Sequence, residues 1–374
     1  MITRLIEKNI ESQLFKNKVI LITGPRQTGK TAIAKLFANK YQGTYYNCEL
    51  GEVKSLLDSN AVTTLSRLIP KSKMVIFDEA QDIPDIGKKL KILYDEFPEI
   101  QIIATGSSSF DLLQETAEPL TGRSREYRLY PLGLEEIIQT SDIIAAQGNL
   151  ENLLRFGAYP EVFSTSNEKE KKEILQNISS NYLYKDTLKF QDIRKPELLK
   201  KLLTLLALQI GNEVSLNKLS NATNTSVQTI ERYLDILEKS FIIFSLSSFA
   251  RNLSKEVAKS KKYFFYDLGI RNSLLNNYNT LPLRNDVGQL WENFCFIERI
   301  KFNEYNRLNK NIYFWRTYDQ QEIDLVEEFD GKLNAFEFKF NSTKFKAPAI
   351  FLDTYEGSKI KVINSTNVFE ILED

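Results

Sequence analysis

Three short apolar runs in the first 110 residues have the length and composition of strands that are buried on both faces. They lie at residues 19–22, at residues 74–77 and within residues 100–109. Helical patterns follow the first two runs, and residues 86–97 place four apolar side chains on one helix face. Residues 2–14 show the same spacing, which predicts an amphipathic helix and not a secretory signal. Strands that alternate with helices predict an α/β domain with a parallel sheet.

The pattern changes after residue 130. Residues 131–195 read as consecutive helices with few strand signals, which predicts a helical lid after the first domain. Residues 196–275 open with a helix at Pro196, continue with two short helices, and end with strands in 241–249 and 261–267. This order of two helices and a hairpin is typical of a winged helix.

The last hundred residues show a third kind of pattern. Residues 288–302 have helical spacing, residues 311–329 contain two strands joined by a polar turn, and residues 334–340 alternate strictly. In that last strand three phenylalanines share one face, while Glu337 and Lys339 share the other. The alternation alone is compatible with an ordinary amphipathic strand. It is equally compatible with an acid and a base directed at a substrate.

A glycine-rich segment joins the first apolar run to the helical pattern that follows it. It reads Gly24-x-x-x-x-Gly29-Lys30-Thr31, the phosphate-loop pattern. The two glycines let backbone N–H groups close around phosphate oxygens, and the helix start adds the positive end of its dipole. Lys30 is expected to reach the β- and γ-phosphates of ATP, and the Thr31 hydroxyl is expected to bind Mg²⁺. The predicted nucleotide-binding residues are Gly24, Pro25, Arg26, Gln27, Thr28, Gly29, Lys30, Thr31, Asp78 and Thr105.

The second and third apolar runs end in polar residues that would complete this site. Asp78 and Glu79 follow the second run. Asp78 is expected to hold the Mg²⁺, and Glu79 is expected to orient and deprotonate the attacking water. Thr105 or Ser107, at the end of the third run, is expected to sense the γ-phosphate, because ligands of parallel sheets bind at the carboxyl edge.

Three arginines near these motifs are candidates for stabilising charge in the transition state. Arg123 and Arg125 are candidate arginine fingers, and Arg123 is the favoured catalytic residue of the two. Arg26, inside the glycine-rich loop, faces a phosphate, a neighbouring subunit or solvent, and solvent is the favoured interpretation.

Composition removes several classes of chemistry. The 374 residues include no histidine, which excludes Ser-His-Asp and Cys-His systems and leaves acid–base work to carboxylates, Lys, Tyr or water. Two distant cysteines give no disulfide framework. Basic and acidic residues are equal in number, 49 of each, which excludes a global field that attracts nucleic acid or membrane. The apolar runs are too short to span a bilayer, which indicates a soluble, cytoplasmic protein.

Several segments together resemble a known family. They read "GPRQTGKT", "IFDEAQ", "ATGSSS" and "LTGR" with "YPLGLEE", followed by "FGAYPEV", "YDLGIR" and "WENF". These segments are similar to those of AAA-type P-loop ATPases of bacteria and archaea that carry a DUF4143 C-terminal region. The resemblance covers nearly the whole chain and implies an ATP-hydrolysing enzyme that forms a homo-oligomer. One departure is Gln191, where members of the family often have a basic residue.

The C-terminal strands carry a second candidate site. Asp324 lies in an apolar strand, Glu337-x-Lys339 follows in the next strand, and Glu292 lies near the start of the preceding helix. This arrangement matches the PD-(D/E)xK nuclease pattern. Asp324 and Glu337 are the expected Mg²⁺ ligands, because that ion prefers hard oxygen ligands. Glu292 is expected to be an additional metal ligand or to support the ligands without contacting the ion. Lys339 is expected to position a water whose pKa the metal lowers, which provides a nucleophile without histidine.

The connection between the two strands of the predicted winged helix is basic. It contains Arg251, Lys255, Lys259, Lys261 and Lys262 against one glutamate. The helix before it also carries acidic residues, which a phosphate backbone would repel. The connection is therefore favoured as a nonspecific DNA contact. The alternative is a winged helix that serves only as a spacer or a subunit contact.

Together these patterns predict an α/β chain. It consists of a P-loop, AAA+-like parallel sheet core, a helical lid, a winged-helix domain and a C-terminal α/β nuclease-like domain. The predicted boundaries are 1–130, 131–195, 196–275 and 276–374. The predicted function is an ATPase coupled to a Mg²⁺-dependent nuclease-like domain that acts on DNA. The alternative is an ATP-driven switch whose C-terminal domain binds a partner without cutting.

Overall fold

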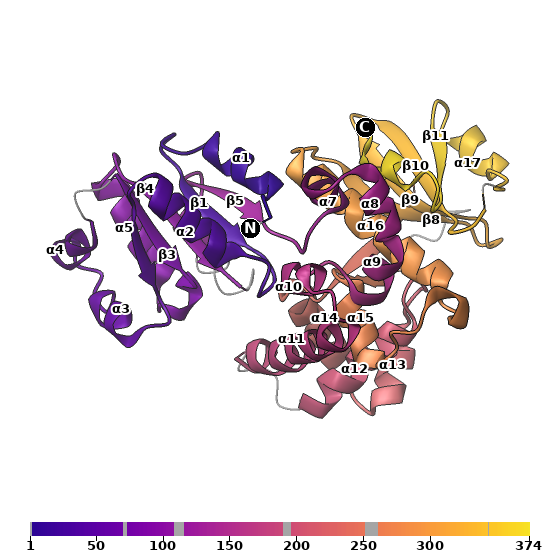
Figure 1. Ribbon diagram of the computed structural model, residues 1–374, viewed down its shortest axis with the longest axis horizontal. Coiled ribbons are helices and arrows are strands. Elements are labelled where there is room, and N and C mark those ends of the chain that lie inside the picture. The colour runs from indigo at the N-terminus through magenta and orange to yellow at the C-terminus, as the bar shows by residue number, and fades with distance from the viewer. Residues whose placement is uncertain (1, 70–72, 108–115, 190–195, 251–260, 343) are drawn as a thin grey trace. The chain divides into compact units, whose positions relative to one another are not determined.

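A computed structural model describes residues 2–69, 73–107, 116–189, 196–250, 261–342 and 344–374. The chain forms two compact units, the first made of Met1–Pro131 with Lys239–Phe241 and the second of Leu132–Glu238 with Ile242–Asp374. Figure 1 colours the chain from indigo through magenta for most of the first unit and on to yellow at the end of the second. The predicted lid, winged helix and nuclease-like domain all fall largely within the second unit.

The first unit is built on a five-stranded sheet in which every neighbouring pair of strands is parallel. The strand order is β2-β3-β4-β1-β5. The strands are β1 (Val19–Thr23), β2 (Thr44–Asn47), β3 (Met74–Asp78), β4 (Gln101–Gly106) and β5 (Ser124–Arg128). The three central strands are the predicted apolar runs, and all of their residues are buried. The edge strands β2 and β5 are missing from the sequence-based prediction, because they are half-buried or exposed and rich in polar side chains.

Helices cover the sheet of the first unit and bury its apolar side chains. They are α1 (Leu5–Glu11), α2 (Lys30–Lys40), α3 (Gly51–Leu56), α4 (Val62–Leu65) and α5 (Ile86–Glu96). α1 buries Ile6 and Ile10, as the spacing predicts. α5 buries Leu90 and Leu93 in one core with Phe77 of β3. Because the strands are parallel, their carboxyl ends meet at one edge of the sheet, where the glycine-rich loop begins.

Helices dominate the first part of the second unit. They are α7 (Leu134–Thr140), α8 (Ile143–Gly148), α9 (Leu150–Phe156), α10 (Pro160–Ser164), α11 (Glu168–Lys189), α12 (Pro196–Leu208), α13 (Leu216–Thr223) and α14 (Val227–Lys239). The helical pattern predicted for residues 131–195 is therefore present wherever those residues are described. That these helices act as a lid stays a prediction.

A six-stranded mixed sheet forms the rest of the second unit, in the order β11-β10-β9-β8-β6-β7. The strands are β6 (Ile243–Phe249), β7 (Lys261–Phe265), β8 (Asn311–Arg316), β9 (Glu322–Phe329), β10 (Lys332–Phe338) and β11 (Lys359–Ile363). The two strands expected in a separate winged helix join this sheet, because β6 pairs in parallel with β8 through Ser248 and Phe249. The sheet therefore crosses the domain boundary predicted at residue 275. α17 (Ala349–Thr354) packs on it through Phe351, which contacts Trp315 of β8.

The phenylalanines of the alternating C-terminal segment pack against α16 (Val287–Tyr305). The rings of Phe338 and Phe296 lie with their centroids 5.3 Å apart, and those of Phe340 and Trp291 lie 5.4 Å apart. Both partners belong to α16, so this face of β10 and its continuation is directed at the helix, as the alternation predicts. The charged residues at the intervening positions, Glu337 and Lys339, do not lie on that face.

A polar junction fastens α9 to α15 (Leu268–Leu275). The Asp267 carboxylate accepts hydrogen bonds from the backbone amides of Ala158, at 2.7 Å, and Ile270, at 3.1 Å. Gly157 ends α9 with a φ of +73°, and a Cβ there would lie 2.1 Å from Asp267 Oδ1. Only glycine combines this backbone conformation with such a close approach. The junction explains why the segments "FGAYPEV" and "YDLGIR" lie together.

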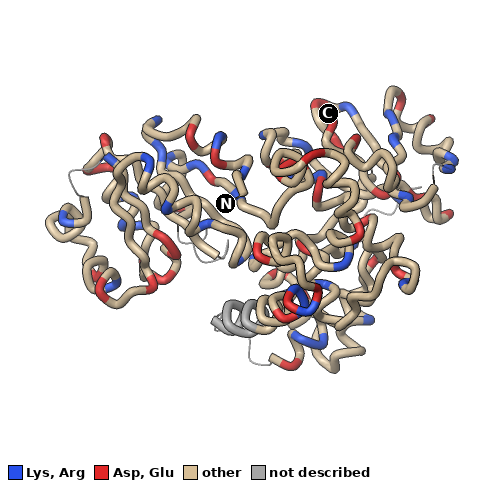
Figure 2. Tube along the Cα trace, in the orientation of Figure 1, with Lys and Arg blue, Asp and Glu red and all other residues tan. Residues whose placement is uncertain are grey.

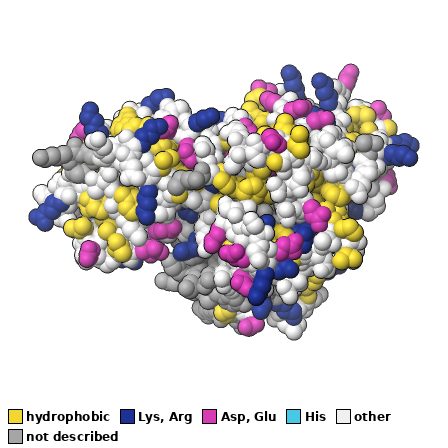
Figure 3. Space-filling model, viewed as in Figure 1, with side chains coloured by type: hydrophobic (Ala, Val, Ile, Leu, Met, Phe, Trp, Pro, Cys, Tyr) yellow, Lys and Arg dark blue, Asp and Glu magenta, His cyan; other side chains and the backbone are white. Residues whose placement is uncertain are grey.

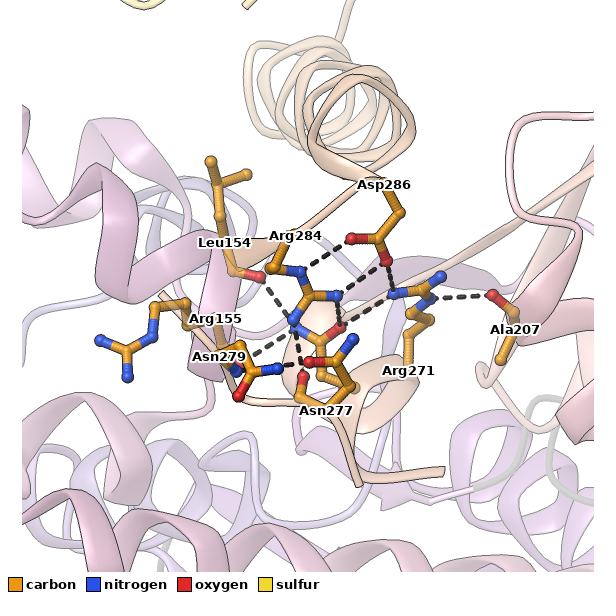
Figure 4. A network of polar contacts seen from close by, with 9 residues as sticks. Leu154, Arg155, Ala207, Arg271, Asn277, Asn279, Arg284 and Asp286 are labelled. Atoms are coloured by element: carbon orange, nitrogen blue, oxygen red, sulfur yellow. Dashed lines mark hydrogen bonds and ion pairs between the residues drawn. The ribbon is translucent and has the colours of Figure 1, made fainter. Parts of the chain in front are cut away.

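Two arginines extend this junction toward the start of α16 (Figure 4). Arg284 donates to Asp286 at 2.8 Å and to the carbonyl of Asn277 at 2.6 Å. Arg271 donates to the same Asp286 carboxylate at 2.5 Å and to the carbonyl of Ala207 at 2.9 Å. One carboxylate between two guanidiniums thus joins α15, the end of α12 and the residue that precedes α16. The junction fixes the start of the helix that carries Glu292.

Basic and acidic side chains are mixed over both units. Figure 2 shows both signs along the trace of each unit, and the face drawn in Figure 3 shows them scattered among apolar and neutral groups. Of the described helices, none has the length and apolar character that a membrane span requires. Any contact with nucleic acid therefore has to come from a local group of charges, as the neutral composition predicts.

Candidate functional site

The glycine-rich loop between β1 and α2 has the conformation of an anion cradle. Gly24 and Gly29 have φ values of +147° and +104°, and a Cβ at Gly24 would lie 2.1 Å from the carbonyl oxygen of Leu129. Around Gly29 a Cβ would meet only one atom within 4 Å, so the loop keeps open space at that point. Gly29 is also the N-cap of α2, where the helix dipole favours an anion. The loop therefore fits the phosphates of a nucleotide.

Two side chains of the loop segment, those of Thr28 and Lys30, are buried. The Lys30 ammonium is buried and donates to the carbonyls of Gly24, at 2.9 Å, and Pro25, at 2.7 Å. The Thr28 hydroxyl also donates to the Pro25 carbonyl, at 2.8 Å. Among the other predicted loop residues, Arg26 is half-buried and Gln27 is exposed with a φ of +59°. Lys30 is thus held within the loop, where it is expected to meet phosphate oxygens.

Asp78, at the end of β3, is the centre of the hydrogen bonds beside this loop. Its Oδ2 accepts from the Thr31 hydroxyl at 2.8 Å and from the Tyr45 hydroxyl at 2.5 Å. Its Oδ1 accepts from the hydroxyl of Thr105. The structure therefore brings together the two predicted Mg²⁺ residues, Thr31 and Asp78, and their hydroxyl and carboxylate oxygens suit that ion. Tyr45 is absent from the sequence-based prediction, because its strand, β2, is not recognised there.

Burial and the bond to Asp78 raise the pKa of Tyr45 well above its ordinary value. Tyr45 therefore acts as a hydrogen-bond donor to Asp78 over the whole physiological range of pH. The Thr105 hydroxyl also accepts from the backbone amide of Glu79, at 3.1 Å, while it donates to Asp78. Thr105 thus links the two acidic residues, and its predicted role in sensing the γ-phosphate stays a prediction.

Glu79 follows Asp78 and has a strained backbone. Its φ of +52° is uncommon for a residue with a side chain, and such conformations concentrate at functional sites. Its Oε2 accepts from the Gln81 amide at 2.6 Å, and the same amide lies 3.3 Å from the hydroxyl of Ser107. The half-buried Glu79 carboxylate is therefore oriented beside Asp78, as a residue that positions water would be. Gln81 is a site residue that the sequence pattern does not reveal.

Arg4 supports the loop from the N-terminal side of α1. It is 5% exposed, and its guanidinium donates to the carbonyl of Thr28 at 2.6 Å and to the carbonyl of Tyr130 at 2.7 Å. It therefore connects the glycine-rich loop to the end of the segment that follows β5. The sequence gives no signal for this role, because the contact joins residues that are far apart in the chain.

The two candidate arginine fingers do not lie at the nucleotide edge of the sheet. Arg123 precedes β5, where its carbonyl accepts from the backbone amide of Val19, and its Nε lies 3.0 Å from Asp95. Val19 begins β1, whereas the loop follows the end of that strand, roughly 13 Å away at about 3.3 Å per residue. Arg125 is exposed and pairs with Ile20 of the same strand. Neither arginine is therefore placed at the nucleotide loop of its own chain, and the predicted role of an arginine finger, on a neighbouring copy, stays a prediction.

The second candidate site is a pocket of about 400 Å³ in the second unit. Its charged lining includes residues from β7, α16, β8, β9 and the position after β10: Lys262, Glu292, Arg316, Glu322, Asp324 and Lys339. Three of the predicted site residues, Glu292, Asp324 and Lys339, therefore share one pocket.

Glu337 lies beside this pocket, opposite Asp324. Phe336 pairs with Leu325 in the β9–β10 ladder, so the same register places Glu337 across from Asp324. Lys339 Nζ lies 2.6 Å from Glu337 Oε1, and Asp324 accepts from the backbone amide of Phe338 at 2.8 Å. Burial and the Asp324 carboxylate raise the pKa of Glu337 to about 7. Its Oε2 is buried and has no hydrogen-bond partner among the described residues.

The three carboxylates predicted as metal ligands do not form one ligand set. Within the part of the chain that is described, no group of three or more Cys, Asp or Glu side chains is placed to hold a metal ion. Glu292 instead pairs with Lys262, with 3.0 Å between Oε1 and Nζ. The prediction that Glu292 is a direct metal ligand is therefore not supported by this arrangement. Asp324 and Glu337 remain as two neighbouring carboxylates. One Glu337 oxygen has no hydrogen-bond partner among the described residues, and carboxylate oxygens of this kind suit a hard cation.

The predicted basic wing is only partly described. Arg251, Lys255 and Lys259, like Gln191, lie outside the described residues. Lys261 is exposed, which is compatible with the prediction. Lys262 is 3% exposed and ion-paired within the acidic pocket, so its assignment to a DNA-contacting surface is wrong. Consecutive side chains on a strand point to opposite faces, so Lys261 and Lys262 cannot both lie on the exposed face. The hydrophobic pattern does not show which of the two is buried.

The raised pKa of Glu337 predicts a pH-dependent effect on stability. In metal-free protein the folded state keeps this proton up to about pH 7, whereas the unfolded chain loses it near 4.5, so the free energy of unfolding falls as pH rises through that window. Glu337→Gln is expected to be more stable than wild type by about 2–3 kcal/mol at pH 8, with the gain vanishing below pH 4.5. Urea unfolding in EDTA across this range measures it. Glu356→Gln, an exposed control, should show no such trend, and an equally flat difference for Glu337→Gln would contradict the prediction.

Comparisons with known proteins agree with this geometry. Residues 16–138 match a family model described as an AAA domain, and residues 147–280 and 287–373 match two domains of unknown function, DUF8612 and DUF4143. An uncharacterized protein of Mycobacterium tuberculosis is 27% identical over 334 residues, which cover 88% of this chain and 72% of the relative. An uncharacterized protein of Methanocaldococcus jannaschii is 28% identical over 363 residues, covering 91% and 79%. The solved structure of a Walker-type ATPase of Pyrococcus abyssi is similar in fold, with a TM-score of 0.51, 17% identity, and coverage of 74% of this chain and 96% of that one.

Proposed function

Because the chain is an AAA-type P-loop ATPase that carries a DUF4143 region, we propose that it hydrolyses ATP to control a Mg²⁺-dependent, nuclease-like site that acts on DNA. The ATPase part rests on the AAA domain match and on the fold shared with a Walker-type ATPase. The observation that carries the nuclease-like part is the placement of Asp324 and Glu337 on neighbouring strands, with one buried Glu337 oxygen left without a partner.

In the ATPase site each residue has a role that follows from its place at the sheet edge. Lys30 and the loop amides bind the β- and γ-phosphates, and Thr31 with Asp78 would hold the Mg²⁺ that travels with the nucleotide. Glu79 orients the attacking water, with Gln81 fixing its carboxylate and Thr105 fixing its backbone. Tyr45 keeps the Asp78 carboxylate in place beside Thr31.

In the nuclease-like site Asp324 and Glu337 would hold a divalent cation, which when bound supplies an activated water and neutralises phosphate charge. Lys339 lies 2.6 Å from Glu337 and is half-exposed, so its ammonium is available at the mouth of the pocket. There it can donate to a phosphodiester oxygen as charge develops. The raised pKa of Glu337 favours this assignment, because perturbed carboxylates concentrate at functional sites.

DNA is the proposed substrate, and a homo-oligomer is the proposed assembly. The chain has no net charge, so its affinity for DNA has to come from local basic groups such as Lys261 and Lys339. Arg123 and Arg125 lie near the start of β1, at the opposite end of that strand from the nucleotide loop. From there we expect them to act on the nucleotide of a neighbouring copy. ATP hydrolysis would change the access of DNA to the pocket.

A paired assay tests this proposal. Wild type, Lys30→Ala and Glu337→Ala are compared for Mn²⁺- or Mg²⁺-dependent cleavage of single- and double-stranded DNA, with and without ATP. Glu337→Ala is expected to abolish cleavage and keep ATP hydrolysis, while Lys30→Ala is expected to lose ATP hydrolysis. Glu356→Ala serves as the control for removal of an exposed carboxylate in the same unit.

A specific observation favours a second candidate function. Lys262 already supplies a positive charge to the acidic pocket, and Lys339 already pairs with Glu337. Some carboxylates in and beside the pocket are thus already neutralised by lysines of the same chain. Such a pocket suits a binding module that works as an ATP-driven switch and does not cleave DNA. Wild-type protein that hydrolyses ATP but cleaves no DNA under any of these conditions would leave this second function.

A further inference from the structure

The acidic pocket of the second unit contains a buried ammonium that the nuclease pattern does not include. Lys262 Nζ, from β7, lies 3.0 Å from Glu292 Oε1 and is bonded to Glu322. The residue is only 3% exposed, and its Nζ lies 5.2 Å from the centroid of the Phe314 ring. The fold therefore holds this cation in one place between two carboxylates, and it is not a mobile surface lysine.

The ion pairs of Lys262 separate the carboxylates in and beside the pocket into two sets, and the ammonium also acts on Asp324 through its charge without forming an ion pair with it. Glu292 and Glu322 are paired with Lys262, whereas Asp324 and Glu337 lie across from each other on the neighbouring strands β9 and β10. The first set has its cation built in. The second set has a buried Glu337 oxygen with no hydrogen-bond partner in the described residues, so one acceptor of this set is unsatisfied.

We propose that Lys262 takes the place of a second divalent cation, so that the pocket binds one divalent ion, at Asp324 and Glu337, and not two. This inference rests on the proposed metal site and specifies how many divalent ions that site binds. A second divalent ion bound by Glu292 would share this carboxylate with the Lys262 ammonium, which lies 3.0 Å from Oε1. The ion and the ammonium would then be close together, and like charges repel strongly in a buried site. Lys262 thereby determines the number of ions.

Substitution of Lys262 tests the proposal by counting bound ions. With Lys262→Met the freed carboxylates are expected to bind a second Mn²⁺ per chain, or to bind Mn²⁺ more tightly by about tenfold or more, because the competing charge is gone. Calorimetric titration with Mn²⁺, without nucleotide, measures both the number and the affinity. Lys262→Arg keeps the charge and is expected to bind one ion, as wild type does.

A matched control uses a buried lysine of the same unit. Lys310 is also nearly buried, with 5% of its side chain exposed, and pairs with Glu327 outside the pocket. Lys310→Met is expected to leave the ion count unchanged. Lys262→Met leaves Glu292 without its ion-pair partner, while Glu322 keeps Arg316 at 3.7 Å. The double variant Lys262→Met/Glu292→Gln is therefore a better balanced form, and it is expected to return to one ion.

The outcomes separate this inference from the proposed function. If wild type binds one ion and Lys262→Met binds one with the same affinity, the role of Lys262 is overturned while the metal site stands. A double variant that still binds two ions also overturns it. If none of the folded proteins binds Mn²⁺ at the pocket, so that Asp324→Asn changes nothing in the titration, the proposed metal site itself fails.

Discussion

Replacement of Lys30 by methionine is expected to lower kcat for ATP hydrolysis by at least about 10²–10³-fold, the loss typical of removing one preorganised donor to developing charge. The ammonium lies inside the glycine-rich loop, where it donates to the carbonyls of Gly24 and Pro25. Methionine has a similar length and no charge, so it fills the space without contacting a phosphate oxygen electrostatically. Because the lost interaction grows as negative charge shifts in the transition state, kcat is expected to fall more than affinity.

The matched control for Lys30 lies at the other end of the same helix. Lys40 ends α2, is half-exposed at 53% of its side chain, and pairs with Glu11 away from the loop. Lys40→Met is therefore expected to keep wild-type hydrolysis. Phosphate release gives the rates, calorimetry with a non-hydrolysable analogue gives the affinities, and thermal unfolding verifies that both variants are folded. Hydrolysis of ATP by Lys30→Met at the wild-type rate would contradict a catalytic role for the Lys30 side chain in the glycine-rich loop.

The elements around the candidate nucleotide site can be predicted from the sequence because they are built from local signals. The strands β1, β3 and β4 are buried on both faces and read as continuous apolar runs, and the motif residues follow the first two of them directly. The edge strands give no such signal. β5, for example, reads Ser-Arg-Glu-Tyr-Arg and is partly exposed, so the pattern does not show that Arg125 lies on a strand. The pattern also does not show that Arg123, just before this strand, lies at the end of the sheet away from the nucleotide loop.

The second site is less predictable because it depends on pairings between distant segments. The alternation at 334–340 predicts which side chains face α16 and which do not. It cannot predict that β6 pairs with β8, more than sixty residues later in the chain, and so brings β7 and Lys262 into the acidic pocket. The same limit applies to Tyr45 at Asp78 and to Arg4 at the glycine-rich loop. In each case the missing information is a tertiary contact with no local pattern.

Replacement of Gly157 by alanine is expected to destabilise the second unit by about 3–5 kcal/mol, through backbone strain and lost hydrogen bonds. The glycine has a φ of +73°, and the new Cβ would lie 2.1 Å from Asp267 Oδ1, where no side-chain atom fits. Asp267 would have to move away from the amides of Ala158 and Ile270, which it accepts from at 2.7 and 3.1 Å. Those buried amides would then lack their acceptor.

The two tryptophans of the chain, Trp291 and Trp315, are both buried in the second unit, so tryptophan fluorescence during urea unfolding reports on that unit alone. Gly148→Ala is the matched control, because a Cβ there meets nothing within 4 Å and the residue ends a helix of the same unit. It is expected to unfold at or slightly above the wild-type urea concentration. If Gly157→Ala unfolded there too, the close approach of Gly157 to Asp267 and the two amide hydrogen bonds of Asp267 would not be what stabilises the second unit.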